Sequence, residues 1–200
     1  MPSTMSSLPN LLTGLRILLL VPIAWTMWSG HYLPCLIMLI VAGVSDALDG
    51  FLARRLDSIS RFGELADPIA DKLLAFVVVV MMLATGLLPL WLGVIVIARE
   101  VVIVSGALAF RSVVKRLDIE PLLISRINTV VQVFVLCTII AAQTEIAYLA
   151  VITSGFVNLV GYYLMAIFAV ASGVAYVYGW TVRLQSHLAQ LDERTEAADP

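Results

Sequence analysis

The residues LLAFVVVVMMLATGLLPLWLGVIVIAREVVIVSGALAF at positions 73–110 form a run of 38 residues that only Arg99 and Glu100 interrupt with charge. A helix that crosses a membrane needs roughly 20 mainly apolar residues, so this run is too long for one crossing. Near its middle, residues 85–89 (TGLLP) contain the glycine and proline typical of a turn. The run therefore predicts two antiparallel membrane helices joined by a short hairpin.

The composition of the whole chain agrees with this prediction. Of the 200 residues, 61% are hydrophobic and 13% are charged, whereas about 25% are charged in ordinary globular domains. The mean hydropathy is +1.01. These values exclude a soluble globular domain, a disordered chain and a disulfide-rich secreted fold, and they predict an all-α integral membrane protein with six transmembrane helices. The predicted spans are residues 11–28, 33–56, 68–84, 90–114, 123–143 and 157–184.

The basic residues are distributed unevenly along these spans. With six spans, every base except Arg99 falls at or near the side shared by both termini, and Arg99 lies deeper, beside Glu100. Lysine and arginine mark the cytoplasmic side, so both termini are expected there. The twelve bases are Arg16, Arg54, Arg55, Arg61, Lys72, Arg99, Arg111, Lys115, Arg116, Arg126, Arg183 and Arg194. We expect one membrane domain over residues 1–184 and a polar, flexible cytoplasmic tail over residues 185–200.

Four aspartates stand at the cytoplasmic ends of the second and third predicted spans. Asp46 and Asp49 are spaced i,i+3, and Asp67 and Asp71 are spaced i,i+4, so each pair shares one face of its helix. Small residues accompany them and permit close helix approach. Four carboxylates that converge repel one another unless cations lie between them. An all-oxygen ligand set favours hard ions, so the sequence predicts a site at the cytoplasmic edge for Mg²⁺ or Mn²⁺, with two ions.

Simpler explanations exist for single aspartates. Asp67 could cap a helix that starts at Pro68, and Asp49 could pair with Arg54. Neither explains all four acids, and acids within membrane segments are functional by default. An ion-coupled transporter is an alternative of another class, but its acids usually lie near the membrane midplane and its sequence shows paired repeats.

The spacing of these residues resembles the signature of the CDP-alcohol phosphatidyltransferase family. That signature runs through eight positions, which are Asp46, Asp49, Gly50, Ala53, Arg54, Gly63, Asp67 and Asp71. The resemblance implies transfer of a phosphatidyl group from CDP-diacylglycerol to an alcohol, with release of CMP, a divalent metal and a homodimer. It also implies a bacterial cytoplasmic membrane or a mitochondrial inner membrane, with membrane lipids and an anionic phospholipid acceptor as partners and no nucleic acid.

The resemblance assigns roles to individual residues. Asp46, Asp49 and Asp67 would hold the metals, and Asp71 would complete the metal site and act as the catalytic base toward the acceptor hydroxyl. The residues expected to bind the CDP-lipid are Thr13, Arg16, Asp46, Gly50, Ala53, Arg54, Gly63 and Asp67.

The acceptor is expected to bind basic and amide groups of the fourth and fifth spans. The candidates are Arg99, Arg111, Arg126 and Asn128. Two alternatives stay open: Arg99 with Glu100 could be a neutralised pair between helices, and Arg111 could be a topology anchor. Residues 125–132 (SRINTVVQ) resemble the cardiolipin synthases of the phosphatidyltransferase type, which use phosphatidylglycerol. Phosphatidylglycerophosphate synthases, which use glycerol 3-phosphate, tend to have two bases here, so phosphatidylglycerol is the expected acceptor and glycerol 3-phosphate the alternative.

Overall fold

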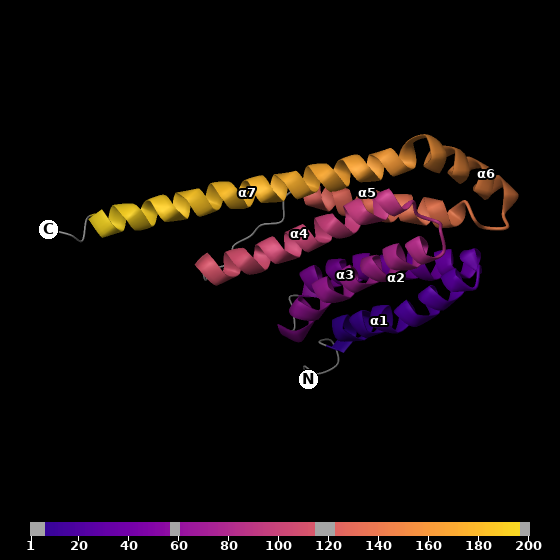
Figure 1. Cartoon of the computed structure of the whole chain (residues 1–200). Helices are drawn as coiled ribbons and strands as arrows, with labels where there is room; N and C mark the ends of the chain where they lie inside the picture. The colour runs from indigo at the N-terminus through magenta and orange to yellow at the C-terminus, as the bar shows by residue number, and fades with distance from the viewer. Residues whose placement is uncertain (1–6, 57–60, 115–122, 197–200) are drawn as a thin grey trace. The chain divides into compact units, whose positions relative to one another are not determined.

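The structure, a computed structural model, describes the backbone of residues 7–56, 61–114 and 123–196 and the side chains of residues 14–45, 72–109, 123–157, 160–183 and 185. All elements in these ranges are helical (Figure 1). They are α1 (Ser7–Trp28), α2 (Tyr32–Leu56), α3 (Arg61–Ala84), α4 (Leu90–Val114), α5 (Leu123–Ala141), α6 (Ala147–Phe156), the π-helical segment η1 (Val157–Gly161) and α7 (Tyr162–Glu196). The predicted all-α class is therefore confirmed for the described residues.

The first five predicted spans each correspond to one helix. α4 has the predicted bounds, and α2 and α5 differ from them by one or two residues at one end. α3 begins at Arg61 rather than at Pro68. The prediction followed hydropathy, which marks where a helix is apolar but does not detect the polar turns that precede the apolar part.

The predicted start of the sixth span at residue 157 is wrong, whereas its predicted end at residue 184 agrees with the apolar stretch Tyr162–Arg183 of α7. Helix α6 starts at Ala147, the π-helical segment follows, and α7 begins only at Tyr162. The sequence is uncharged throughout this region, so hydropathy could not separate the three segments. Helix α7 continues to Glu196, which gives residues 185–196 helical backbone. The flexibility of the tail stays a prediction.

Three helices are long and apolar enough to cross a membrane among the residues whose side chains are described. They are Leu90–Ala109, Leu123–Ala141 and Tyr162–Arg183. The described parts of α1, α2 and α3 are shorter apolar stretches, Gly14–Trp28, Tyr32–Ser45 and Lys72–Ala84. Large apolar side chains such as Val21 and Trp25 on α1 are more than two-thirds exposed, as expected for a chain surrounded by lipid. The count of six spans remains a prediction.

Two glycines end helices in the same way. Gly30 has a φ of 75° and follows α1, and Gly86 has a φ of 74° and follows α3. After α1, the Gly30 amide donates to the Met27 carbonyl and the His31 amide donates to the Thr26 carbonyl. This pair of bonds is the Schellman motif, which satisfies carbonyls at a helix end and needs a left-handed residue. The hairpin predicted at residues 85–89 and the turn after α1 are therefore both built on glycine.

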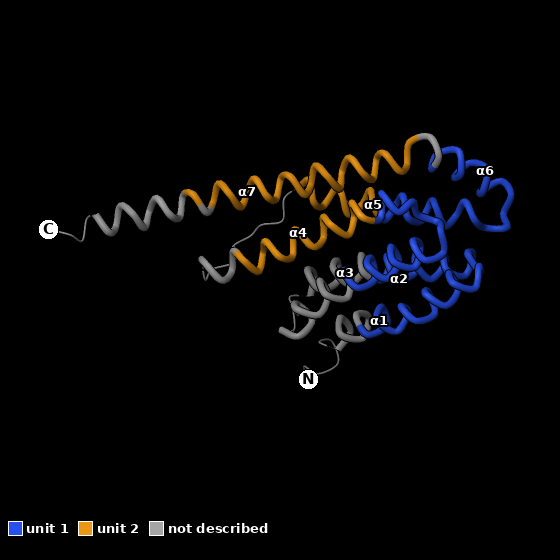
Figure 2. Tube along the Cα trace, viewed as in Figure 1, with its two compact units in different colours: residues 1–93, 133–159 blue, residues 94–132, 160–200 orange. Residues whose placement is uncertain are grey.

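The described chain forms two compact units (Figure 2). The first contains residues 1–93 and 133–159, and the second contains residues 94–132 and 160–200. In the first unit, α1 packs against both α2 and α3. Its buried side chains include Ile23 and Met27 of α1, Cys35 of α2 and Val79 and Met82 of α3.

Close packing in the second unit depends on a glycine. A Cβ atom added to Gly106 of α4 would lie 1.8 Å from the ring of Trp180 of α7. The indole ring thus occupies the space that a side chain at position 106 would need. Small residues of this kind let membrane helices approach closely, because association in lipid relies on packing.

Candidate functional site

The four aspartates of the signature lie on helical backbone in the first unit. Asp46 and Asp49 belong to α2, and Asp67 and Asp71 belong to α3. The predicted spacings therefore apply, and each pair lies on one face of its helix. The side chains of all four lie outside the described residues. So do those of Ala53 and Arg54, and the side-chain environments of Gly50 and Gly63.

The backbone excludes one of the simpler explanations. Asp67 could act as an N-cap only if a helix began immediately after it, whereas α3 begins at Arg61. Asp67 is therefore an interior residue of α3. A carboxylate inside a helix cannot cap the helix, because the backbone amides there are already bonded within it. The presence of Asp67 therefore needs another reason, such as ligand binding.

The donor set fits a divalent metal. Two helical carboxylate pairs on α2 and α3 offer only oxygen ligands, which suit Mg²⁺ and Mn²⁺ better than zinc. Asp46, Asp49, Asp67 and Asp71 would hold the ions. Their presence on two neighbours of α1 is compatible with a shared site.

Arg16 is the one residue of the predicted CDP-lipid set whose side chain is described. It lies on α1, which packs against α2 and α3, and only 2% of its surface is exposed. A guanidinium remains charged under all ordinary conditions, so its burial in a membrane protein points to a specific role. The side chain of Thr13, predicted for the same pocket, lies outside the described residues.

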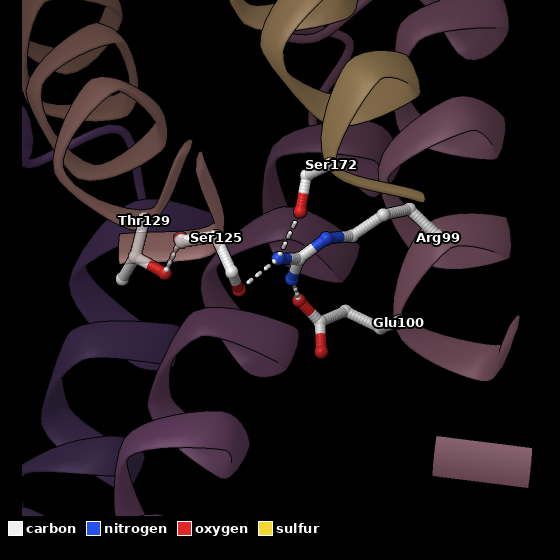
Figure 3. Close-up of polar contacts among 5 residues, drawn as sticks. All are labelled: Arg99, Glu100, Ser125, Thr129 and Ser172. Carbon is white, nitrogen blue, oxygen red and sulfur yellow. Dashed lines mark hydrogen bonds and ion pairs between the residues drawn. The ribbon is translucent and has the colours of Figure 1, made fainter. Parts of the chain in front are cut away.

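Arg99 is the centre of a polar network in the second unit (Figure 3). It lies within the apolar part of α4 and is 8% exposed. Its Nη1 forms an ion pair with the carboxylate of Glu100. Its Nη2 donates one hydrogen bond to Ser125 Oγ of α5 at 2.8 Å and another to Ser172 Oγ of α7 at 2.9 Å. The guanidinium thus joins three helices by its hydrogen bonds to α5 and α7. Its ion pair with Glu100 lies within α4, so it is not the pair between helices that the sequence left open.

Asn128, unlike Arg99, has no hydrogen-bond partner among the described residues. It lies one turn after Ser125 on α5 and is 1% exposed. Neither Nδ2 nor Oδ1 has a hydrogen-bond partner among the described residues. A buried amide in an apolar helix is costly when unsatisfied, so the position of this side chain needs a reason other than the fold, such as a ligand.

The other acceptor candidates lie in different surroundings. Arg126, between Ser125 and Asn128 in α5, is exposed. Gln132 continues the buried side of α5 and is 6% exposed. The side chain of Arg111 lies outside the described residues. The described candidates of α5 therefore combine one exposed cation with one buried, unpartnered amide.

Comparison with known proteins agrees with these features. Residues 6–180 match the CDP-alcohol phosphatidyltransferase family. The chain belongs to this family. Family members generally depend on a divalent metal, which agrees with the carboxylate donors on α2 and α3.

Relatives with two different acceptors are similar to this chain. It is 35% identical over 142 residues to a probable CMP-forming cardiolipin synthase of Drosophila melanogaster, a match that covers 63% of this chain and 44% of the relative. It is 32% identical over 187 residues to a chloroplastic CDP-diacylglycerol–glycerol-3-phosphate 3-phosphatidyltransferase of Oryza sativa, covering 85% and 56%. A Rickettsia typhi protein with the same glycerol-3-phosphate activity in its name is 30% identical over 153 residues, covering 74% and 85%. The chain thus spans about half the length of the first two relatives.

The sequence did not identify Ser172 as a functional residue. It lies in the last apolar stretch, in the segment AVASGVAY, where a serine beside a glycine is an ordinary small residue of a membrane helix. Its hydrogen bond to a residue 73 positions earlier could be found only from the structure.

Proposed function

We propose that this protein transfers a phosphatidyl group from CDP-diacylglycerol to phosphatidylglycerol, forming cardiolipin and releasing CMP. The family assignment supports the reaction class. The observation that carries the choice of acceptor is the pair on α5, in which Arg126 is exposed and Asn128 is buried with no partner in the described part of the chain.

The charge of these groups favours a monoanionic acceptor. Arg99 is already neutralised by Glu100, so Arg126 is the described cation of α5 that remains for a ligand. Phosphatidylglycerol has one negative charge on its phosphodiester. Glycerol 3-phosphate is close to a dianion and gains from two cations. An amide such as that of Asn128 can donate to a phosphate oxygen or a glycerol hydroxyl without adding charge.

The proposed chemistry assigns the reaction to the aspartates of α2 and α3. The acceptor hydroxyl oxygen forms a bond to the phosphatidyl phosphorus, and the bond between that phosphorus and the CMP oxygen breaks. Asp71 accepts the hydroxyl proton, and Arg54 and Arg16 contact the nucleotide phosphates. A bound divalent metal supplies charge neutralisation for the pyrophosphate and the leaving CMP.

Glycerol 3-phosphate is the second candidate acceptor. The Oryza sativa relative, whose name specifies that substrate, matches 85% of this chain. Arg111, whose side chain lies outside the described residues, would then supply the second cation.

One assay separates the two acceptors. The purified protein in mixed micelles with Mg²⁺ or Mn²⁺ would receive labelled CDP-diacylglycerol and a single acceptor, and the released CMP would be measured. We expect product with phosphatidylglycerol. Product with glycerol 3-phosphate alone would overturn the acceptor assignment, and no CMP release with any alcohol would overturn the activity. Family membership gives no support to the transporter hypothesis.

A pair of variants tests the role of Asp71. Asp71→Asn is expected to lower turnover by about 100-fold or more, the range usual for loss of a general base. Glu145→Gln is the matched control, because Glu145 is an exposed acid in the turn between α5 and α6. Equal activity of both variants would remove Asp71 from the proposed chemistry.

The membrane arrangement is part of the proposal. Six spans place both termini and the carboxylates on the cytoplasmic side of a bacterial cytoplasmic membrane or a mitochondrial inner membrane. A homodimer is proposed from family resemblance. Labelling of single cysteines at positions 31 and 145 from outside intact cells, compared with position 185, would test the orientation.

A further inference from the structure

We propose that Arg99 is a positioning residue for the acceptor site, and that it acts through Ser125 and Ser172 rather than by touching the acceptor. The inference rests on the proposed function, because it concerns how α5 presents its acceptor residues. It assigns a role to Ser172 and changes the role predicted for Arg99.

The geometry of the guanidinium supports this assignment. Nη2 carries two hydrogens, and the hydroxyls of Ser125 and Ser172 accept one each, at 2.8 and 2.9 Å. Nη1 is held by the Glu100 carboxylate. Both terminal nitrogens of the guanidinium are therefore already engaged by protein groups, whereas Nε has no hydrogen-bond partner among the described residues. An acceptor could bind Nη2 only by displacing the hydroxyls of Ser125 and Ser172.

The network contacts the first turn of α5 through Ser125. The Ser125 side chain accepts from Arg99, and the Ser125 carbonyl accepts a hydrogen bond from Thr129 Oγ1 at 3.1 Å (Figure 3). Arg126 is the next residue and Asn128 lies one turn further. Successive helical residues are about 100° apart, so the rotation of α5 that Ser125 sets also determines that Arg126 is exposed and Asn128 is buried.

The hydrogen bonds of Arg99 are costly to lose because they lie in an apolar part of α4. Arg99 lies inside Leu90–Ala109, a segment apolar enough to cross a membrane. Water cannot replace a lost partner at such a site, so removal of one serine hydroxyl leaves a charged donor unsatisfied.

Kinetic measurements on serine variants test the proposal. Ser125→Ala and Ser172→Ala are each expected to raise the KM for phosphatidylglycerol about tenfold, the equivalent of one hydrogen bond to a charged group. The KM for CDP-diacylglycerol and kcat should stay within about twofold, since neither serine belongs to the residues assigned to those steps. Ser125→Thr keeps the hydroxyl and should restore acceptor KM. Ser105→Ala is the matched control, because the hydroxyl of the exposed Ser105 of α4 donates to the Val102 carbonyl of its own helix.

Two kinetic results would overturn the proposal. If both serine variants keep a normal acceptor KM while Arg99→Lys impairs it, Arg99 touches the acceptor directly. If both variants lower the melting temperature and raise both KM values alike, the network only stabilises the fold.

A measurement without turnover separates this proposal from the proposed function. A spin label on Ile127→Cys, in a background with Cys35 and Cys137 replaced by alanine, reports the surroundings of α5 beside Arg126. Ser172→Ala should change the spectrum of this label, whereas Ser105→Ala should not. An unchanged spectrum would overturn the positioning role even if the enzyme is active. Absence of CMP release by the parent protein would overturn the proposed function alone.

Discussion

The replacement Asn128→Leu should stabilise the protein and weaken acceptor binding at the same time. Asn128 is 1% exposed, and both of its amide atoms lack partners within the described part of the chain. Leucine branches at Cγ as asparagine does but has no polar atoms. If the Asn128 amide had a structural role, the replacement would lower the stability of the protein. The sign of the change therefore distinguishes a structural role from a ligand-binding role.

The size of the gain follows from the two unsatisfied atoms. Each unsatisfied buried polar atom costs about 1–3 kcal/mol in a folded protein. Separated helices in a membrane also leave the amide without water, so part of this cost exists before folding and cancels. A net gain of about 1–2 kcal/mol remains, which corresponds to a rise in melting temperature of about 2–8 °C for a chain of this size.

Thermal unfolding in detergent, with and without phosphatidylglycerol, measures both effects. At a lipid concentration of 100 Kd the parent protein should gain about 2.7 kcal/mol from binding. A variant that binds tenfold more weakly should gain about 1.4 kcal/mol at the same concentration. Thr138→Val is the control on α5, because the Thr138 hydroxyl is satisfied by the Val135 carbonyl at 2.8 Å and its loss should not stabilise.

A fall in melting temperature for Asn128→Leu would refute the reasoning, because it would show that the amide has a structural partner. Equal stabilisation of the variant and the parent by phosphatidylglycerol would show that Asn128 does not contact the acceptor.

Three further predictions concern packing, a turn and the metal site. Gly106→Ala should lower the free energy of unfolding by about 1–3 kcal/mol through overpacking against Trp180, whereas Gly155→Ala, whose Cβ would meet no atom within 4 Å, should cost far less in the same unfolding measurement. Gly86→Ala should cost about 1–2 kcal/mol because its φ of 74° is unfavourable for a residue with a Cβ, and a normal melting temperature would contradict the Schellman assignment. Chelation by EDTA should abolish CMP release, and added Mg²⁺ or Mn²⁺ should restore it. Activity that persists in chelator would contradict the metal role of the four aspartates, Asp46, Asp49, Asp67 and Asp71.

Much of the fold could be predicted because hydropathy is a local property. Lipid offers no hydrogen bonds to the backbone, so an apolar stretch of sufficient length must form a helix. That reasoning placed α4 at its observed bounds. It was wrong about the start of the sixth span, since uncharged sequence on both sides of the π-helical segment contains no signal of the break.

The sequence predicted the aspartates of the candidate site but not the partners of Arg99, because only the aspartates form a local pattern. The spacing of the aspartates is a local pattern, and the helical backbone of α2 and α3 agrees with it. The role of Arg99 is not local. The sequence showed Glu100 beside it but not Ser125 and Ser172, which lie 26 and 73 positions away.

The sequence by itself determined that the chain is a helical membrane protein of the CDP-alcohol phosphatidyltransferase family. Composition, hydropathy and residue spacing depend only on the order of residues along the chain and not on which helices pack together. Only the tertiary structure decided that Arg99 is held by Glu100, Ser125 and Ser172, while the buried Asn128 amide finds no hydrogen-bond partner among the residues that the structure describes. Which polar groups are satisfied depends on which helices pack together, and in lipid that choice follows from shape, as at Gly106 and Trp180, rather than from hydropathy.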